Sequence, residues 1–255
     1  MSARDLYDGI GVGYTATRQP DPRLAAALHQ ALGDARTVLN VGAGAGAYEP
    51  RDREVRAVEP SAVMIAQRPP RAARVLQASA EALPLADDSV DAAMAVLTDH
   101  HWRDRLAGLR ELRRVARRRV VLFNLDPSLA DRFWLTGEYL PGHRRLIAAR
   151  YRTPGIWTAE LARELGAIHL EPFPIPHDCR DGFYAAFWRR PAAYLDQRVR
   201  DGISIFRLLP DDEVGAGMSR LGADLDTGRW KARHADLLQR DALDLGYRIV
   251  IAELG

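Results

Sequence analysis

The fold is decided by a short apolar strand followed at once by a turn of small residues, Val38-Leu39-Asn40-Val41-Gly42-Ala43-Gly44-Ala45-Gly46-Ala47. Glycine permits positive φ and a close approach of the backbone to a ligand, which the amides of a following helix can then face. The stretch also satisfies Gly-x-Gly-x-x-Ala, a pattern typical of dinucleotide-binding folds. Such a turn can also exist without a ligand, so the neighbouring sequence must distinguish the two interpretations.

A carboxylate follows at the end of the next expected strand. Glu59 ends the segment Val55-Arg56-Ala57-Val58-Glu59-Pro60-Ser61, seventeen positions after Gly42. An acidic side chain at the tip of the second strand can accept hydrogen bonds from both ribose hydroxyls of an adenosine-containing ligand. Alone, Glu59 could be a surface carboxylate. Together with the glycine turn, it predicts a ligand that carries a ribose.

Around this stretch, short apolar runs alternate with helical patterns, which indicates βαβ units and a parallel sheet. The expected strands are 37–41, 54–58, 74–77, 91–97 and 119–124, with helices at 22–32, 62–67, after Ser79 and at 104–116. Beyond residue 125, helices fit 129–138, 158–165, 182–188 and 191–208, and strands fit 168–173 and 247–253. Because the final strand must rejoin the sheet to be buried, we expect the helical stretch before it to cover the strand ends as a cap.

The composition is that of a soluble globular domain with a buried core: 47% of the 255 residues are hydrophobic and 27% are charged. The formal net charge is only +2. The arginines of segment 102–120 lie on other faces than its apolar residues, which recur every third position, so we interpret this segment as an amphipathic helix with a solvated side. Binding of nucleic-acid phosphates is the less favoured alternative.

No apolar run reaches the roughly eighteen residues that would span a membrane, and the N-terminal segment has no apolar stretch of signal-peptide length. Cys179 is the only cysteine and cannot form an intrachain disulfide, which suits a reducing compartment. We therefore expect a cytoplasmic protein with neither a membrane nor a nucleic-acid partner.

The segment before the fourth expected strand carries a further motif, Ser79-Ala80-Glu81-Ala82-Leu83-Pro84-Leu85-Ala86-Asp87-Asp88-Ser89-Val90-Asp91. It resembles the pattern D-A-E-x-L-P-F-x-D-x-S-F-D of methyltransferases of the ubiquinone/menaquinone-biosynthesis type (methyltransferase type 11). Segment 40–46 resembles the first motif of that family, and segment 59–64 resembles its second. The similarity covers roughly residues 7–126.

The resemblance implies a class I methyltransferase that uses S-adenosylmethionine (SAM) and releases S-adenosylhomocysteine. Its implied fold is α/β and Rossmann-like, with a mostly parallel seven-stranded sheet flanked by helices and a helical cap after the fifth strand. We expect one domain over residues 1–255, made of a helical lead (1–35), a Rossmann-like core (36–125), and a cap with returning strands (126–255). The long helical lead also favours SAM over NAD, because it is unusual for a dinucleotide-binding domain.

The resemblance also implies the cofactor contacts. The glycine turn would pass beneath the methionine part of SAM through Gly42, Ala43, Gly44 and Gly46. Glu59 would hold the ribose. The adenine would be bordered by Pro60, Ser61 and Met64, and Ala80 would offer its amide to the ring. Ser79 and Glu81, on either side of Ala80, are further cofactor-binding candidates. Leu97 and Thr98 would lie beside the methyl group. Tyr14 and Arg18 match the family's Y-x-x-x-R and are expected to close over the cofactor, with Arg18 paired to its carboxylate.

Two residues depart from the family pattern. Asn40 stands where the first motif usually has an acidic residue, and Ser79 stands where an Asp commonly contacts the adenine amine. Both changes remove negative charge near a cationic cofactor, although both side chains can still form hydrogen bonds. We therefore expect weaker or rearranged SAM binding, and a changed cofactor stays open.

The candidate catalytic residues are His100 and His101, which follow the fourth expected strand. Ligands of open α/β sheets bind beyond the carboxyl ends of the strands, and a histidine there could take a proton from a hydroxyl or ammonium acceptor. Asp99 could orient the imidazole. Histidines with a purely structural role are the alternative.

A metal site is not expected. Adjacent histidines have poor metal spacing. In segment 172–183, a metal site at His177, Asp178 and Cys179 is less favoured than ordinary turn and helix-capping chemistry. A further group of aromatic residues could line an acceptor pocket or belong to the core: Tyr139, Tyr151, Phe183, Tyr184 and Trp188.

The sequence therefore predicts transfer of a methyl group from SAM to a small-molecule metabolite. An NAD-dependent oxidoreductase is the alternative from another class, because of the Gly-x-Gly-x-x-Ala match. A SAM-binding protein without methyl transfer is a third hypothesis. An RNA or protein methyltransferase is not favoured, since there is no strong basic patch. The acceptor, the methylated atom and the oligomeric state, including a homodimer, stay open.

Overall fold

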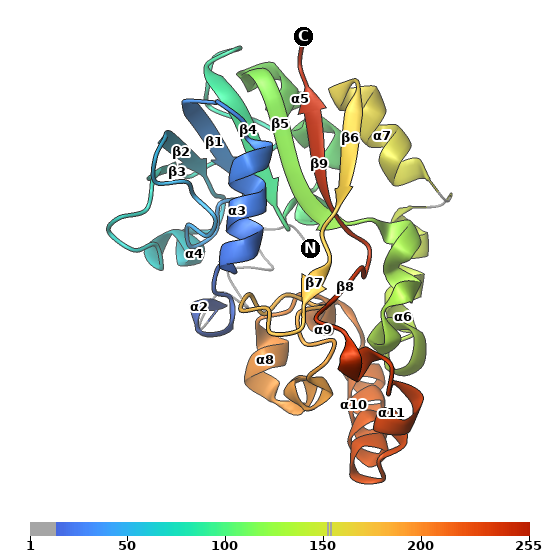
Figure 1. Ribbon diagram of the computed structural model, residues 1–255. Helices are drawn as coiled ribbons and strands as arrows, with labels where there is room; N and C mark the ends of the chain where they lie inside the picture. Colours follow the sequence, from blue (N-terminus) through green and yellow to red (C-terminus); the bar gives the residue numbers. More distant parts are fainter. Residues whose placement is uncertain (1–13, 152, 154) are drawn as a thin grey trace.

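A single seven-stranded sheet dominates the computed structural model, which describes residues 14–151, 153 and 155–255 (Figure 1). The strands lie in the order β3-β2-β1-β4-β5-β9-β6. Their bounds are β1 Thr37–Val41, β2 Glu54–Val58, β3 Arg74–Leu76, β4 Val90–Val96, β5 Ala116–Leu125, β6 Ile168–Pro172 and β9 Tyr247–Glu253. The pairs of the first five strands are parallel, and β9 runs antiparallel to both β5 and β6. The mostly parallel seven-stranded sheet predicted from the sequence is confirmed.

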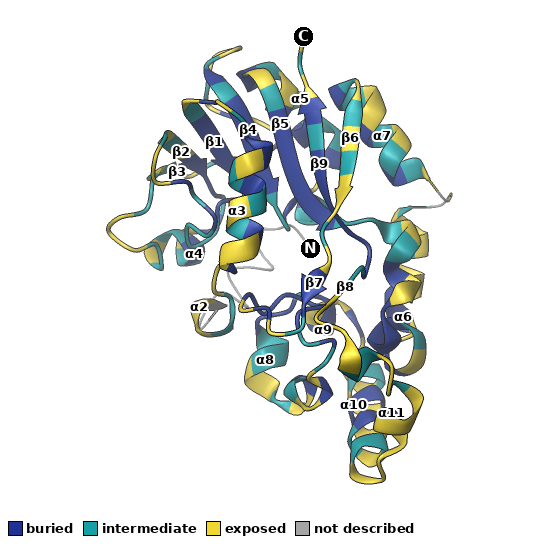
Figure 2. Cartoon of the chain, in the orientation of Figure 1, coloured by how far each residue is buried: buried dark blue, intermediate teal, exposed yellow. Residues whose placement is uncertain are grey.

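The central strands are buried on both faces, as their near-continuous apolar runs require. On one face, α3 (Pro22–Ala31) packs through Leu24, Leu28 and Ala31. On the other face lie α5 (Arg105–Val115) and α7 (Ile156–Leu165), whose buried leucines join the second core cluster. Figure 2 shows the same division, with buried strands between helices whose outer sides are exposed.

Three helices within the first 125 residues begin at side-chain caps that the local sequence provides. The Asp21 carboxylate accepts the amide of Arg23 at the start of α3, and the Asp104 carboxylate accepts the amide of Ala107 at the start of α5. Ser61 caps the short α4 (Ala62–Ala66) in the same way. Such caps satisfy amides that a helix leaves unpaired at its N-terminus. These helices match the predicted ones to within one or two residues.

The cap covers the carboxyl ends of the parallel strands, below the sheet in Figure 1. After β5 the chain forms η2 (Pro127–Arg132), η3 (Leu135–Tyr139) and α6 (Gly142–Arg150). The second part follows β6 and comprises β7 Ile175–Pro176, η4 Pro191–Leu195, α8 Gln197–Asp201, α9 Ile205–Leu208, α10 Asp211–Asp226, α11 Arg229–Arg233, η5 Leu237–Gln239 and β8 Ala242–Leu243. The short α2 (Tyr14–Thr17) and η1 (Asp99–His101) complete the described elements.

Several helices predicted for the cap, and one predicted for the segment after Ser79, are broken or absent in the structure. The continuous helix expected at 191–208 is broken into η4, α8 and α9, and 182–188 forms turns instead of a helix. Segment 129–138 is interrupted at Phe133, whose backbone is extended (φ −96°, ψ 118°). A 3-10 turn precedes this residue and a π turn follows it. No helix follows Ser79, because the Leu83 amide donates to the Glu111 carboxylate and holds that segment as turns.

Helix α10 went unpredicted because only a few of its sixteen residues are buried. Its glycines weaken a helical pattern in the sequence, yet one of them is required by packing. A Cβ on Gly217 would lie 2.4 Å from the backbone oxygen of Tyr139. The missing side chain therefore lets α10 approach η3 closely.

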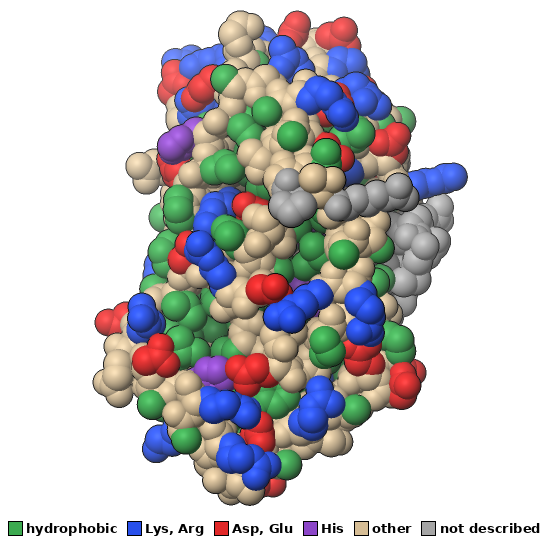
Figure 3. Space-filling model, turned by 90° about the vertical axis from the view of Figure 1, so that its right-hand side faces the viewer, with side chains coloured by type: hydrophobic (Ala, Val, Ile, Leu, Met, Phe, Trp, Pro, Cys, Tyr) green, Lys and Arg blue, Asp and Glu red, His purple; other side chains and the backbone are tan. Residues whose placement is uncertain are grey.

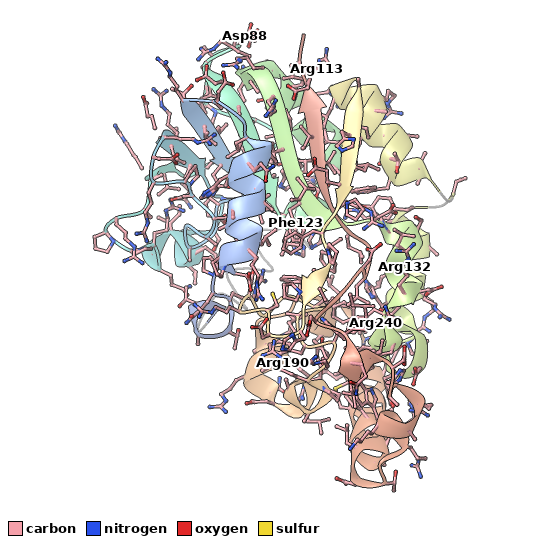
Figure 4. The ribbon with its side chains drawn as sticks, viewed as in Figure 1. Asp88, Arg113, Phe123, Arg132, Arg190 and Arg240 are labelled. Atoms are coloured by element: carbon pink, nitrogen blue, oxygen red, sulfur yellow. The ribbon has the colours of Figure 1, made fainter. Side chains whose placement is uncertain are left out.

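An aromatic cluster joins the cap to the sheet. Phe123 of β5, labelled in Figure 4, lies 5.6 Å from the Phe173 ring, 6.1 Å from Phe183 and 5.6 Å from Tyr247, measured between ring centroids. Edge-on and stacked contacts of this kind add to the free energy of burial. The cap is therefore part of the same core as the sheet.

The surface shows no extended region of one charge sign on the face drawn in Figure 3, where basic and acidic side chains alternate. Within the described residues, no helix combines the length and the hydropathy needed to cross a membrane.

Candidate functional site

The glycine turn after β1 adopts the backbone conformations that favour glycine. Gly42, Gly44 and Gly46 have φ values of +67°, +51° and +88°. A Cβ on Gly42 would lie 2.1 Å from Oγ1 of Thr98, so Gly42 permits close packing against the end of β4. A Cβ on Gly44 would meet only the Met64 methyl within 4 Å, at 3.3 Å. The space above Gly44 therefore belongs to the neighbouring cavity.

A buried ion pair supports this turn from below. Arg68 donates to the backbone oxygen of Gly44 at 3.1 Å and to the Glu49 carboxylate at 2.7 Å, and both charged side chains are over 90% buried. The other Glu49 oxygen accepts the amide of Ala73 at 2.9 Å. Breaking such a pair leaves a buried charge without its partner. Sequence reasoning missed both residues, because neither belongs to a motif.

The hydrogen bonds around Glu49 also explain why residue 40 is an asparagine, where the family usually has an acidic residue. Its side-chain amide donates to Glu49 at 3.4 Å, and the residue is only 2% exposed. An acidic residue at this position would place a second carboxylate against Glu49, and like charges this close resist ionisation of both groups. Asparagine is therefore the residue that fits this turn.

The carboxylate of Glu59 faces the glycine turn. It accepts the Gly44 amide at 2.8 Å on one oxygen and the Ser61 amide at 2.9 Å on the other. The residue is 4% exposed, so it is not a surface carboxylate. Each carboxylate oxygen can accept more than one hydrogen bond, which leaves capacity for two hydroxyl donors. Glu59 is thus suited to a diol and also ties the turn to the end of β2.

A cavity of about 1060 Å³ opens at the carboxyl ends of β1, β2 and β4. Ten of the predicted cofactor residues line it: Gly42, Gly44, Glu59, Pro60, Met64, Ser79, Ala80, Glu81, Leu97 and Thr98. Further lining residues that the sequence did not indicate include Gln77, Trp102 and Arg105. The structure therefore brings most of the predicted set together, although their contact with a cofactor stays a prediction.

Other predicted cofactor residues lie elsewhere or have a second task. Ala43 and Gly46 belong to the turn without lining the cavity, and Ser61 caps α4. Glu81 lines the cavity, but its carboxylate accepts the amides of Arg103 at 2.7 Å and Asp104 at 3.2 Å.

Arg18 lies apart from most of the other predicted cofactor residues, and its pairing with the SAM carboxylate stays a prediction. Arg18 does not line the cofactor cavity but a second one, and its guanidinium pairs with Asp181 at 2.5 Å. Asp181 also accepts the hydroxyl of Tyr48 at 2.8 Å, which ties the cap to the segment after the glycine turn. The Tyr14 side chain lies outside the described part of the chain; its backbone begins α2.

The second cavity, of about 430 Å³, lies between the sheet and the cap. Leu97 borders both cavities. It has φ +53°, a left-handed conformation rare for leucine, and its amide donates to the backbone oxygen of Phe123. The chain therefore turns sharply at the end of β4, where the two spaces meet.

His100 and His101 lie on this turn and line the second cavity. Their ring centroids are 3.8 Å apart. The Asn124 amide lies 3.1 Å from Nδ1 of His100, and the Asn124 oxygen accepts the Leu125 amide, which fixes the amide orientation. Nδ1 of His100 is thus an acceptor, as in a neutral imidazole.

Both imidazoles are held neutral. Burial, followed by the nearby charges of Arg150 and Arg18, lowers the pKa of His100 to about 3. Burial, then His100 and Arg150, hold the pKa of His101 well below its usual range. The charged form is disfavoured by both lost hydration and cationic neighbours.

Asp99 orients His100 indirectly instead of directly. Its carboxylate pairs with Arg105 at 2.8 Å and accepts the amide of Asn124, which in turn contacts His100. Arg105 also pairs with Glu160 of α7 at 2.8 Å. Asn124 is a site residue that sequence reasoning missed; its place at the end of β5, beside β4, was the available signal.

The segment at 177–179 has a structural role. Asp178 pairs with Arg23 at 2.7 Å, and burial raises the pKa of the Cys179 thiol to about 12. Over residues 14–151, 153 and 155–255, no three metal-ligating side chains converge. Of the aromatic candidates, Tyr151, Phe183 and Tyr184 line the second cavity, whereas Tyr139 and Trp188 belong to the core.

The comparisons with known proteins agree with this geometry. Residues 39–123 match the family model of the methyltransferase domain. The chain is also 34% identical to a candidate methyltransferase from an antibiotic biosynthesis pathway of Anabaena variabilis, with a TM-score of 0.84 over 93% of this chain and 99% of that one. The protein belongs to the class I SAM-dependent methyltransferases. The narrower ubiquinone/menaquinone type stays a prediction.

More distant structures share the methyltransferase fold alone. The [4+2]-cyclase SpnF is 14% identical, with a TM-score of 0.53 over 98% of this chain and 94% of that one. Phosphoethanolamine N-methyltransferase 2 of Haemonchus contortus, solved with SAM, is 13% identical, with a TM-score of 0.55 over 99% of this chain and 60% of that one. No curated protein matches this methyltransferase.

Proposed function

We propose that this methyltransferase transfers the methyl group of SAM to a small-molecule acceptor. The observation that carries the proposal is the meeting of two cavities at Leu97, one behind the glycine turn and one beneath the cap. A donor in the first and an acceptor in the second would face each other at the end of β4. Holding two reactants in line supplies much of the rate enhancement of a displacement.

The first cavity suits SAM by its own residues. Glu59 provides two acceptor oxygens for the ribose hydroxyls. The open space over Gly44 admits the part of a ligand that lies against the backbone of the glycine turn. The volume of about 1060 Å³ is that of a typical cofactor site. Bound SAM supplies an electrophilic methyl carbon on a sulfonium.

The chain's residues around the second cavity would position the acceptor and keep water away from it. His100 and His101 are neutral at physiological pH and would accept a proton from a hydroxyl or ammonium group, if the acceptor has one. Because a histidine with a strongly lowered pKa is a weak base, positioning should contribute more than proton transfer. The volume of about 430 Å³ fits a metabolite better than a folded macromolecule.

The most similar structure reported above supports a small molecule as acceptor. The Anabaena protein, 34% identical to this chain, comes from an antibiotic biosynthesis pathway. Nothing in the charge distribution of Figure 3 favours a polyanion as partner.

Calorimetric titration with SAM, S-adenosylhomocysteine and NAD tests the cofactor. We expect the first two to bind and NAD not to bind. Incubation with isotopically labelled SAM and a metabolite extract, followed by mass spectrometry, tests transfer. A labelled methyl group on an extract component would support the proposal. SAM binding without any labelled product would favour the binding protein without transfer, and binding of NAD alone would favour the oxidoreductase.

A further inference from the structure

The second cavity carries an excess of cationic and imidazole groups over acidic ones. Its lining includes Arg18, Arg150, His100, His101 and His143, and no Asp or Glu among the described residues that line it. A methyl acceptor bound there would therefore sit among hydrogen-bond donors and positive charge. Such a lining disfavours an ammonium group and favours an anion.

Two of the nearby charges are compensated. Arg18 is paired with Asp181, and the buried Asp99 behind the histidines is paired with Arg105. The Glu160 carboxylate lies on the far side of Arg105 and does not line the cavity. These groups form local ion pairs, so each charge acts on the cavity together with its partner of opposite sign and its field there is weakened.

Arg150 differs in its ion pairing from these residues and from its neighbours on α6. Arg144 and Arg145 pair with Asp131 and Glu213. Within the described part of the chain, Arg150 has no carboxylate within ion-pair distance; one of its Nη atoms lies 3.5 Å from the backbone oxygen of Trp102. Its guanidinium thus stands at the cavity with a charge that no described carboxylate offsets.

The pKa values of the two histidines reflect the same positive charge. Burial contributes most to the lowered pKa of His100, and the largest contributions after burial come from the positive charges of Arg150 and then Arg18. For His101, Arg150 and Arg18 lower the pKa, while Asp99 opposes them. The potential at this end of the cavity is therefore positive.

Most of the remaining lining is apolar, with Asn124 and Ser204 as polar exceptions. Leu146, Ile147, Ile205 and Leu208 line it, together with the rings of Phe183 and Tyr184. These side chains can bury a hydrocarbon or aromatic body, while the arginine serves one polar end. A ligand that fits both parts has an apolar body and one acidic group.

We propose that the methyl acceptor is an apolar, ring-sized molecule with an acidic group, which Arg150 holds as its anion. The inference rests on the proposed function, since it concerns the acceptor cavity of that reaction. Arg150 is then a specificity-determining residue, because its planar guanidinium can form two parallel hydrogen bonds to a carboxylate.

Matched probes test this preference. Two sets of probes each contain an acid, an amide and an amine that differ mainly in the polar end. The first set is phenylpropionate, phenylpropionamide and phenylpropylamine, and the second is naphthoate, naphthamide and naphthylmethylamine. Each is titrated by ligand-observed NMR into the protein, with and without S-adenosylhomocysteine. We expect each acid to bind at least tenfold more tightly than its amide and its amine, with the preference falling as salt is added.

Arg150→Gln should abolish the preference for the acid, and the matched variant Arg145→Gln on the same helix should retain it. SAM affinity should be unchanged in both variants. Equal or tighter binding of the amides or amines, binding of none of the probes, or an acid preference that survives in Arg150→Gln would overturn the inference. These outcomes do not depend on the proposed function, which fails instead if the wild-type protein does not bind SAM.

Discussion

Glu59→Ala is the most direct test of the cofactor site, because this carboxylate joins the ligand cavity to the glycine turn. The substitution removes both oxygens, which accept the amides of Gly44 and Ser61 and are expected to accept the two ribose hydroxyls. Glu54, an exposed residue at the start of the same strand, has the nearby Arg56 as its only ion-pair partner among the described residues and provides the matched control.

The expected magnitude follows from the two lost ligand contacts. A hydrogen bond to a charged group contributes about 1.5 kcal/mol at the lower end of the measured range. Two such contacts amount to about 3 kcal/mol, which corresponds to a loss of SAM affinity of about a hundredfold. Folding should also weaken by about 1–2 kcal/mol, since two amides lose their acceptor in a buried position. This cost to folding follows from the burial of Glu59, which is only 4% exposed.

Isothermal titration calorimetry measures the Kd for SAM, and thermal denaturation measures stability, for wild type, Glu59→Ala and Glu54→Ala. Glu54→Ala should match wild type in both, because exposed ion pairs contribute little. A Glu59→Ala protein that is folded and binds SAM within twofold of wild type would refute the assigned role. Glu59→Gln should be intermediate, since it keeps one oxygen.

Four other outcomes are expected. Gly44→Val should abolish SAM binding in calorimetry while circular dichroism stays native, because a branched side chain would enter the cavity and resist a φ of +51°; normal titration would mean that the turn binds nothing. His101→Ala should keep SAM affinity and lower kcat by less than the roughly 10²–10⁴-fold that loss of a general base causes, because positioning should contribute more than proton transfer; a fall within that range would identify His101 as a general base, and His100→Ala must be measured beside it. Wild-type kcat should stay flat between about pH 8 and pH 6, since the pKa of His100 is about 3; a fall in that range would contradict neutral histidines. Burial lowers the pKa of His143 from 6.5 to about 4, so protonation favours the unfolded chain and stability is lost as pH falls between those values. The free energy of unfolding, measured by chemical denaturation, should fall with decreasing pH up to about 1.4 kcal/mol per pH unit more steeply in wild type than in His143→Asn. Equal slopes would rule out a contribution of His143.

The parallel sheet and the glycine turn could be predicted because their signals are local. Buried parallel strands have near-continuous apolar sequences, and positive φ at consecutive turn positions favours glycine. Residues Val38 to Gly46 carry both signals within one short segment. The cap was less predictable: η4, α8 and α9 are short helices stabilised by packing, so periodicity alone joined them into one.

Sequence alone therefore determined the fold, the candidate cofactor turn and the position of Glu59, since each depends on residues a few positions apart. Only the tertiary structure decided which partners these residues have. Arg18 meets Asp181 across 163 positions of sequence, and Asn40 faces Glu49 because β1 and the following loop fold over Arg68. Arg150 comes to the histidine pair only because the end of α6 and the turn after β4 line the same cavity. Burial and electrostatic fields sum over neighbours in space, so no local pattern in the chain encodes them.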